Sequence, residues 1–110
     1  MALRILIGAA AAATAISVLA GDTVPLPASL WDRPRSGDIV LGLPEVRQAV
    51  NACLTQPGAR LIIHHTTGQE PQLQAEELRA WLVALAISAE QVALRNDLNP
   101  GDPLKIEVVQ

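Results

Sequence analysis

Apolar residues after Pro44 recur at the spacing of an amphipathic helix. In the segment PEVRQAVNACLTQ one stripe is formed by Val46, Ala49, Val50, Cys53 and Leu54. Proline suits the first helical turn, and Glu45 lies at the positive end of the helix dipole. The pattern therefore predicts a helix that ends at Pro57-Gly58.

A second helix is predicted from Pro71, through the segment QLQAEELRAWLVALA. Its apolar positions recur at helical spacing and are Leu78, Trp81, Leu82 and Leu85. The charged side chains between them lie largely on the other faces. We therefore expect Trp81 and Leu82 to be largely buried against a sheet.

Shorter apolar stretches predict four strands. Residues 38–41 (DIVL) form a short β-branched run, and residues 59–66 (ARLIIHHT) start apolar on both alternating faces, as in a central strand. A third strand is expected near residues 91–95, and the last strand alternates over residues 104–108. The order predicts an α/β domain of the α+β class over residues 37–110, with two helices on a mixed sheet.

The N-terminal segment has the layout of a secretory signal. Arg4 precedes residues 5–20 (ILIGAAAAATAISVLA), which carry no charge, and the small residues Val18 and Ala20 stand before Gly21. A membrane-spanning helix needs about 20 apolar residues, so a cleaved signal is favoured over an uncleaved anchor. We expect the protein in the periplasm, or anchored in the inner membrane through residues 1–20 if they are retained.

Residues 21–36 contain Pro25, Pro27 and Pro34 and show neither helical nor alternating spacing. This composition predicts an extended, proline-rich linker. Trp31 is the exception, because a large aromatic side chain in a linker usually packs on something. It either covers an edge of the domain core or contacts a protein partner.

Composition limits the partners. Half of the 110 residues are hydrophobic and 17% are charged, which fits one small domain. The net charge is −3, Phe and Tyr are absent, and no basic cluster occurs, so nucleic acid is excluded as a partner. Cys53 is the single cysteine and is expected to be a small buried hydrophobe.

The adjacent histidines, His64 and His65, are the most suggestive chemical feature. Successive side chains of a strand point to opposite faces, so the pair does not chelate one metal, and we expect no metal and no cofactor. By alternation with Leu61 and Ile63, His65 is expected to pack under a helix with its ring hydrogen-bonded, while His64 faces solvent or another helix layer. No nucleophile motif, phosphate loop or paired acidic signature occurs, which predicts a protein that is not an enzyme.

The order of elements resembles the C-terminal, peptidoglycan-associating domain of outer-membrane protein A (OmpA-like domains). That family has strand, helix, a strand ending in a GHTD-type motif, helix, strand, and a last strand similar to NRRVEIVV. Here LPEVRQAVNACLTQPGARLIIHHTTG is similar to the first helix and second strand, with His65-Thr66-Thr67 at the motif. LRAWLVALAISAEQVAL and DPLKIEVVQ are similar to the later elements. The resemblance implies a small β-α-β-α-β-β domain over roughly residues 37–110.

The resemblance also implies a ligand site. Family members bind the diaminopimelate carboxylates of the wall peptide with an Asp after the Thr and an Arg on the helix. Here Thr67 stands at the Asp position, and Arg79, or in another placement Gln74, stands at the Arg position. The candidate ligand-binding residues are Thr66, Thr67 and Arg79. We expect a non-enzymatic binding or scaffold module of the cell envelope with a degenerate peptidoglycan site.

Two alternatives remain open. One is a functional peptidoglycan-binding protein that uses these three residues. The other is a small accessory subunit of an envelope complex, which would contact a protein partner through Trp31.

Overall fold

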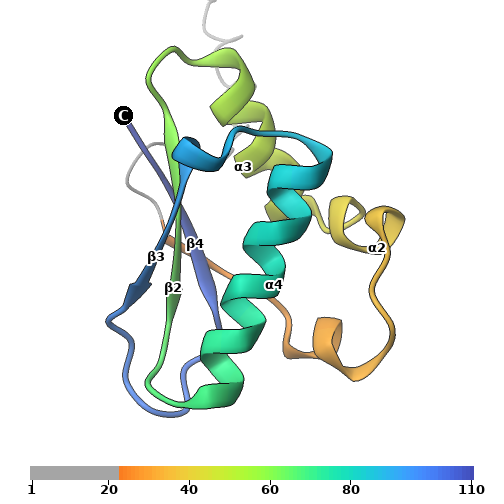
Figure 1. Cartoon of the computed structure of the whole chain (residues 1–110), viewed down its shortest axis with the longest axis vertical. Coiled ribbons are helices and arrows are strands. Elements are labelled where there is room, and N and C mark those ends of the chain that lie inside the picture. The colour runs from red at the N-terminus through yellow and green to blue at the C-terminus, as the bar shows by residue number, and fades with distance from the viewer. Residues whose placement is uncertain (1–22) are drawn as a thin grey trace, which may run out of the picture.

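A computed structural model describes residues 23–110, and in this part of the chain three α-helices pack on one face of a four-stranded mixed sheet (Figure 1). The predicted α+β class is confirmed, although the sequence predicted two helices rather than three. The predicted signal or anchor, residues 1–20, lies outside the described residues.

The sheet has the strand order β1-β4-β2-β3. Its strands are β1 (Thr23–Pro25), β4 (Lys105–Val109), β2 (Arg60–His65) and β3 (Val92–Asn96). β2 and β3 are parallel, whereas β4 runs antiparallel to both of its neighbours, β1 and β2. Because a parallel pair needs a crossover connection, the chain between β2 and β3 passes through a helix on the sheet.

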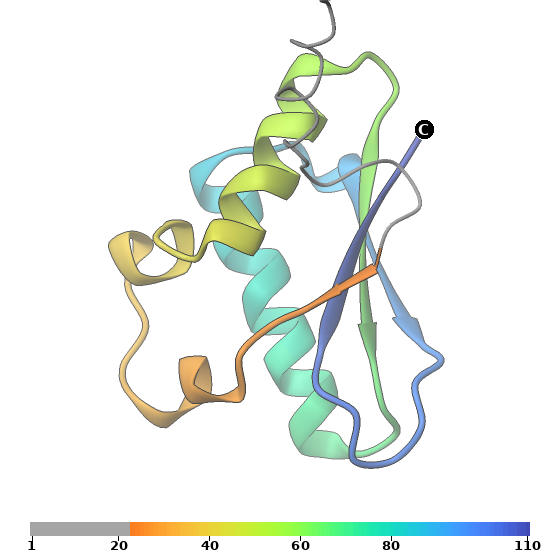
Figure 2. The ribbon, with the colours of Figure 1, turned by 180° about the vertical axis from the view of Figure 1, so that it is seen from behind.

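The helices lie on one side of the sheet, as the view from behind also shows (Figure 2). α3 (Pro44–Thr55) packs against β4 and β2, and α4 (Gln69–Leu85) packs against β2 and β3. The shorter α2 (Gly37–Leu41) contacts both of these helices. Two 3₁₀ helices are also present, at Ala28–Asp32 and Ala89–Gln91. In the described part of the chain, no helix covers the opposite face of the sheet.

Most predicted elements are confirmed within a few residues. α3 begins at Pro44, and β2 lies inside the predicted stretch 59–66. α4 begins at Gln69, slightly before the predicted start at Pro71. The structure has the order β-α-α-β-α-β-β, which is the predicted β-α-β-α-β-β order with α2 added and with β1 in place of the strand expected at residues 38–41.

Residues 38–41 form a helix, so the strand predicted there is wrong. The hydroxyl of Ser36 accepts a hydrogen bond from the backbone N–H of Ile39 at 3.2 Å and caps the first turn. One turn of helix buries Val40 completely and leaves Asp38 exposed. Here a short β-branched run forms a helical turn, because Ser36 caps it and Val40 within it is buried in the core.

The segment 21–36, predicted to be an extended linker, belongs to the domain where the structure describes it. β1 pairs with β4, and the backbone N–H of Leu26 donates to the carbonyl of Leu104 at 2.9 Å. Leu26 and Leu30 are both buried. An edge strand such as β1 tolerates Pro25, because it has no second neighbouring strand that would need the N–H that proline lacks.

The core fills the space between the helices and the inner face of the sheet. Its fully buried large side chains include Leu30, Leu61, Ile63, Leu78, Leu82 and Ile106. Cys53 on α3 is buried as predicted, and burial raises the pKa of its thiol. Leu82 is also buried as predicted, but Trp81 is only half-buried, because neighbouring residues on a helix point about 100° apart.

Candidate functional site

The two threonines of the candidate ligand site lie at the carboxyl end of β2. Thr66 is buried, whereas Thr67 is exposed. The hydroxyl of Thr67 donates to Oδ1 of Asn96 at 3.3 Å. Both threonines are therefore next to the end of β3.

Arg79 lies at the other end of these strands. Its Nε donates to the carbonyl of Val92 at 3.1 Å, and its Nη2 donates to the carbonyl of Ala89 at 2.9 Å. Val92 begins β3 and Asn96 ends it, so at about 3.3 Å per residue the two ends of the strand are about 13 Å apart. The structure does not bring Arg79 together with the two threonines.

Replacing Arg79 by alanine is expected to lower the free energy of unfolding by about 1–2 kcal/mol, because two backbone carbonyls lose a charged donor. Chemical denaturation measures this loss. Arg33→Ala removes an exposed arginine and is the matched control. A variant at Arg79 that keeps full stability but loses affinity for purified wall sacculi would contradict this structural role.

The two histidines point to opposite faces of β2, as the alternation predicted. His65 lies on the helix-covered face and is buried, with its Nδ1 at 2.9 Å from the carbonyl oxygen of Thr66. His64 lies on the uncovered face and is nevertheless only 7% exposed. The expectation that His64 faces solvent or a second helix layer is wrong, because neighbouring side chains of the sheet bury it.

Two carboxylates hold the ring of His64. Its Nδ1 lies 2.8 Å from Oδ1 of Asp97, and its Nε2 lies 2.8 Å from Oε1 of Glu107. Both contacts are within hydrogen-bonding distance. Asp97 directly follows β3 and Glu107 lies on β4, so the ring of His64 links β2 to both of its neighbours.

This cluster is not suited to binding a metal ion. Asp97 and Glu107 contact opposite nitrogens of the ring, so a single ion cannot contact all three side chains. Within residues 23–110, no group of three or more His, Cys, Asp and Glu side chains is arranged to hold a metal. The geometry of the cluster fits a structural link across the sheet.

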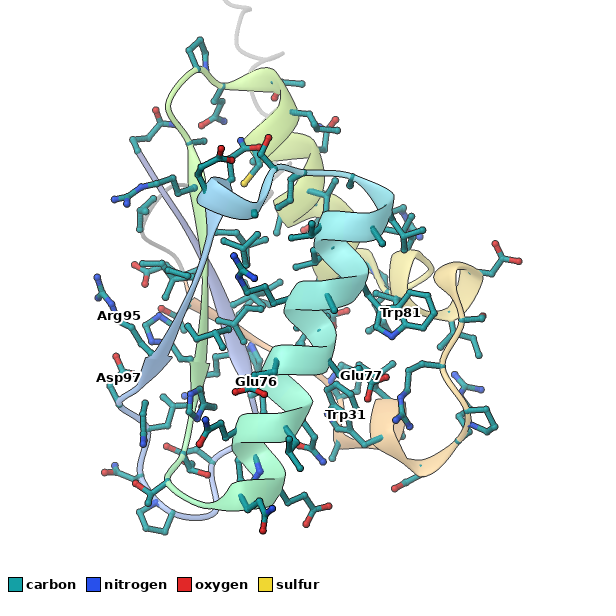
Figure 3. The ribbon with its side chains drawn as sticks, viewed as in Figure 1. Trp31, Glu76, Glu77, Trp81, Arg95 and Asp97 are labelled. Carbon is teal, nitrogen blue, oxygen red and sulfur yellow. The ribbon has the colours of Figure 1, made fainter. Side chains whose placement is uncertain are left out.

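Trp31 is half-buried and packs against the hydrophobic core beside α4. The guanidinium of Arg35 lies 5.2 Å from the centre of the Trp31 ring and makes two hydrogen bonds of 2.9 Å to the carboxylate of Glu77. Trp81 donates from Nε1 to the same carboxylate at 3.1 Å. Figure 3 shows Trp31, Glu77 and Trp81 on one side of α4, far from Arg95 and Asp97. Trp31 thus belongs to a cluster that fastens the N-terminal segment to α4.

A shallow groove of about 420 Å³ lies beside this cluster, and Trp31, Leu73 and Gln74 are among its lining residues. Gln74, the alternative to Arg79 in the candidate ligand site, is therefore on the Trp31 side of α4. Its amide lies 3.5 Å from Oε2 of Glu70. Gln74 supplies no positive charge for a carboxylate ligand.

The pairing with Arg35 lowers the pKa of Glu77, and the hydrogen bond from Trp81 acts in the same direction against the effect of burial. A carboxyl group with a lowered pKa stabilises the fold above its unfolded pKa of about 4.3. That contribution is lost as the pH falls through the lower, folded-state pKa. We therefore expect Glu77→Gln to be less stable than the natural chain at pH 7 but nearly equal to it in strong acid.

Urea denaturation of both proteins between neutral and strongly acidic pH measures this difference. The other carboxylates titrate in both proteins, so their effect cancels in the difference in stability between the two. A stability difference between them that does not change with pH would contradict the ion pair.

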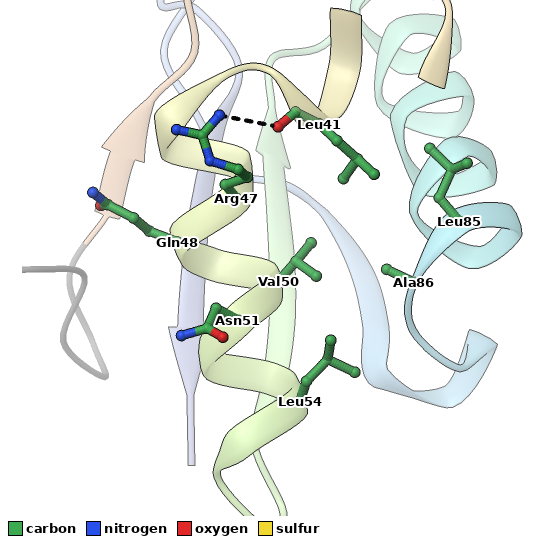
Figure 4. A pocket seen from close by; sticks show the side chains of 8 residues that line it. All are labelled: Leu41, Arg47, Gln48, Val50, Asn51, Leu54, Leu85 and Ala86. Atoms are coloured by element: carbon green, nitrogen blue, oxygen red, sulfur yellow. Dashed lines mark hydrogen bonds between the residues drawn. The ribbon is translucent and has the colours of Figure 1, made fainter. Parts of the chain in front are cut away.

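A hollow on the surface lies between α3 and the carboxyl end of α4 (Figure 4). It measures about 660 Å³ and is lined by Leu41, Arg47, Gln48, Val50, Asn51, Leu54, Leu85 and Ala86. We call this hollow the α3–α4 groove. Leu54 is 61% exposed and Leu85 is 40% exposed, although both continue the apolar stripes that predicted their helices.

The physical reason is the position of each leucine on its helix. Leu54 and Leu85 both stand in the last turn of a helix, at α3 and α4 respectively. Val50, one turn earlier on α3, is still buried. The apolar stripes therefore continue beyond the core and line the groove instead.

No helix within residues 23–110 has both the length and the apolar character needed to cross a membrane. No family model matches the chain, no curated protein is detectably similar in sequence, and no solved structure is detectably similar in fold.

Proposed function

We propose that this chain is a non-enzymatic binding or scaffold module of the cell envelope, and that it binds a protein rather than the cell wall. The observation that carries the proposal is the α3–α4 groove, into which Leu54 and Leu85 project from two different helices. Apolar side chains gathered in a surface hollow are typical of interaction sites. The envelope location is supported by the export-type sequence of residues 1–20 and by the resemblance to OmpA-like domains.

The candidate wall-binding residues support this choice between partners. Arg79 donates from Nε and Nη2 to two backbone carbonyls, and Thr66 and Thr67 lie at the other end of β3. A hydroxyl cannot pair with the ammonium group of diaminopimelate as a carboxylate does. A functional peptidoglycan-binding protein would need a different arrangement of these side chains, so an accessory subunit of an envelope complex is the stronger alternative.

The proposal is tested by photocross-linking in cells that produce the protein. A benzophenone amino acid at Leu54 or Leu85 is expected to give one discrete product with a second protein. The matched control is Val83, which is also exposed and on α4 but does not line the groove. A product from Leu73 alone would place the partner on the Trp31 side of α4 and contradict the choice of groove.

The choice between protein and wall is tested by co-sedimentation with purified sacculi. We expect most of the protein to remain in the supernatant at physiological salt. Tight co-sedimentation, together with no cross-linked product from Leu54 or Leu85, would contradict the proposal.

A further inference from the structure

The shape of the α3–α4 groove fits a third helix. Its lining includes Val50, which is 7% exposed, and Ala86, which is half-buried, together with the exposed leucines Leu54 of α3 and Leu85 of α4. An apolar groove between two helices is the kind of surface into which an amphipathic helix packs. α3 has 12 residues, so at 1.5 Å per residue a partner helix of about three turns would lie along it.

The rim of the groove carries one kind of charge. Within residues 23–110, Arg47 is the only ionisable residue that lines it. Its Nη1 donates to the carbonyls of Leu41 and Gly42, at 3.4 and 3.1 Å, which fixes the guanidinium beside the groove. Within the described residues, Nε and Nη2 of Arg47 make no hydrogen bond. This side of the guanidinium has the fork geometry that binds a carboxylate with two hydrogen bonds.

Charge also distinguishes between occupants. A second copy of the chain in a two-fold arrangement would present the same groove residues, which include Arg47 and no carboxylate. The chain's own apolar segment, residues 5–20, contains no acidic residue. Neither occupant supplies a partner for Arg47.

We infer that the α3–α4 groove binds an amphipathic helix of a protein partner, with large apolar side chains on the buried face and an acidic residue beside them that pairs with Arg47. This inference rests on the proposed function and names the chemistry of the partner. The apolar side chains recur at positions i, i+3 or i+4, and i+7 of the partner helix, facing Leu54 and Leu85. The acidic residue fixes the direction of the helix in the groove.

The test uses the full chain and three synthetic helical peptides of equal length. The acidic probe has a leucine stripe flanked by glutamates, the basic probe has lysines in place of the glutamates, and the third has the leucines replaced by serines. We expect the acidic probe to bind at least about tenfold more tightly than the basic probe at low salt, and the serine probe not to bind. Fluorescence anisotropy gives the affinities, and amide chemical shifts locate the binding site.

Variants of the chain sharpen the test. Arg47→Glu is expected to reverse the preference, so that the basic probe binds more tightly. Leu54→Ser and Leu85→Ser are expected to weaken both probes, whereas Val83→Ser, the matched control on α4, leaves the affinities unchanged. Equal affinity of the acidic and basic probes, or shifts centred on Leu73, would overturn the inference.

Other occupants give different results. A dimer that Leu54→Ser dissociates would show that a second copy fills the groove, and a cross-link from Leu54 within a single chain would show that residues 5–20 fill it. Either result overturns the inference. A cross-linked partner at Leu54 without any preference for the acidic probe overturns only the inferred chemistry of the partner. If there is neither a cross-linked partner nor a preference for the acidic probe, the proposed function is overturned as well.

Discussion

Leu82→Ala is expected to lower the free energy of unfolding by about 2–5 kcal/mol, the usual cost of truncating a buried leucine. Leu82 lies on α4 and is 1% exposed, so its loss leaves a cavity between α4 and the sheet that the packed core cannot close. The same substitution at Leu73, on the same helix but 55% exposed, is expected to change stability by less than about 0.5 kcal/mol.

Urea denaturation of the two variants measures this contrast. Small domains have about 5–15 kcal/mol of stability, so Leu82→Ala can leave too little folded protein for a complete curve. Leu82→Met keeps most of the side-chain volume and is expected to cost less than about 1.5 kcal/mol. This variant therefore leaves enough folded protein for a complete denaturation curve. Similar losses for Leu82→Ala and Leu73→Ala would contradict the orientation of α4 on the sheet.

The second large effect is expected from His64→Ala, which removes the ring between Asp97 and Glu107. Water can hydrate the side chain of Asp97, which is 45% exposed, but reaches Glu107 poorly, because that side chain is 19% exposed. A fully buried acceptor left without its donor costs about 1–3 kcal/mol, and for the partly buried Glu107 we expect a loss near the lower end of this range at neutral pH.

The matched control for this variant is Arg95→Ala. Arg95 is paired with His64 across β2 and β3 and is exposed, so its removal is expected to cost less than about 0.5 kcal/mol. Amide hydrogen exchange supplies a second readout, because loss of the ring should raise exchange in the segment that follows Asp97. If His64→Ala is as stable as Arg95→Ala, the ring does not link the strands.

Local sequence patterns predicted the helices and strands whose formation depends on residues that are neighbours in the sequence. Pro44 marked the start of α3, and the alternation over residues 59–66 placed His64 and His65 on opposite faces of β2. The same rule failed for residues 38–41, where a cap at Ser36 and a single core position make a helical turn from a β-branched run. Short segments carry too few residues for periodicity to separate a turn of helix from a strand.

The candidate sites were less predictable, because they depend on which elements become neighbours. Thr66, Thr67 and Arg79 were grouped by the resemblance to OmpA-like domains, but Arg79 reaches the start of β3 and the threonines lie at its end. The contact between Glu107 and His64 depends on the register between β2 and β4. This register relates two strands, so the sequence pattern of a single strand does not predict it.

The sequence by itself determined the α+β class, the positions of α3, α4, β2, β3 and β4, and the side of β2 on which each histidine lies. These follow from backbone periods of about 3.6 and 2 residues, which act over a few neighbours. The tertiary structure decided that Leu54 and Leu85 line the α3–α4 groove and that His64 meets carboxylates 33 and 43 residues away. Those contacts depend on strand order and helix packing, because only the folded chain brings distant segments together and shows which apolar side chains remain uncovered.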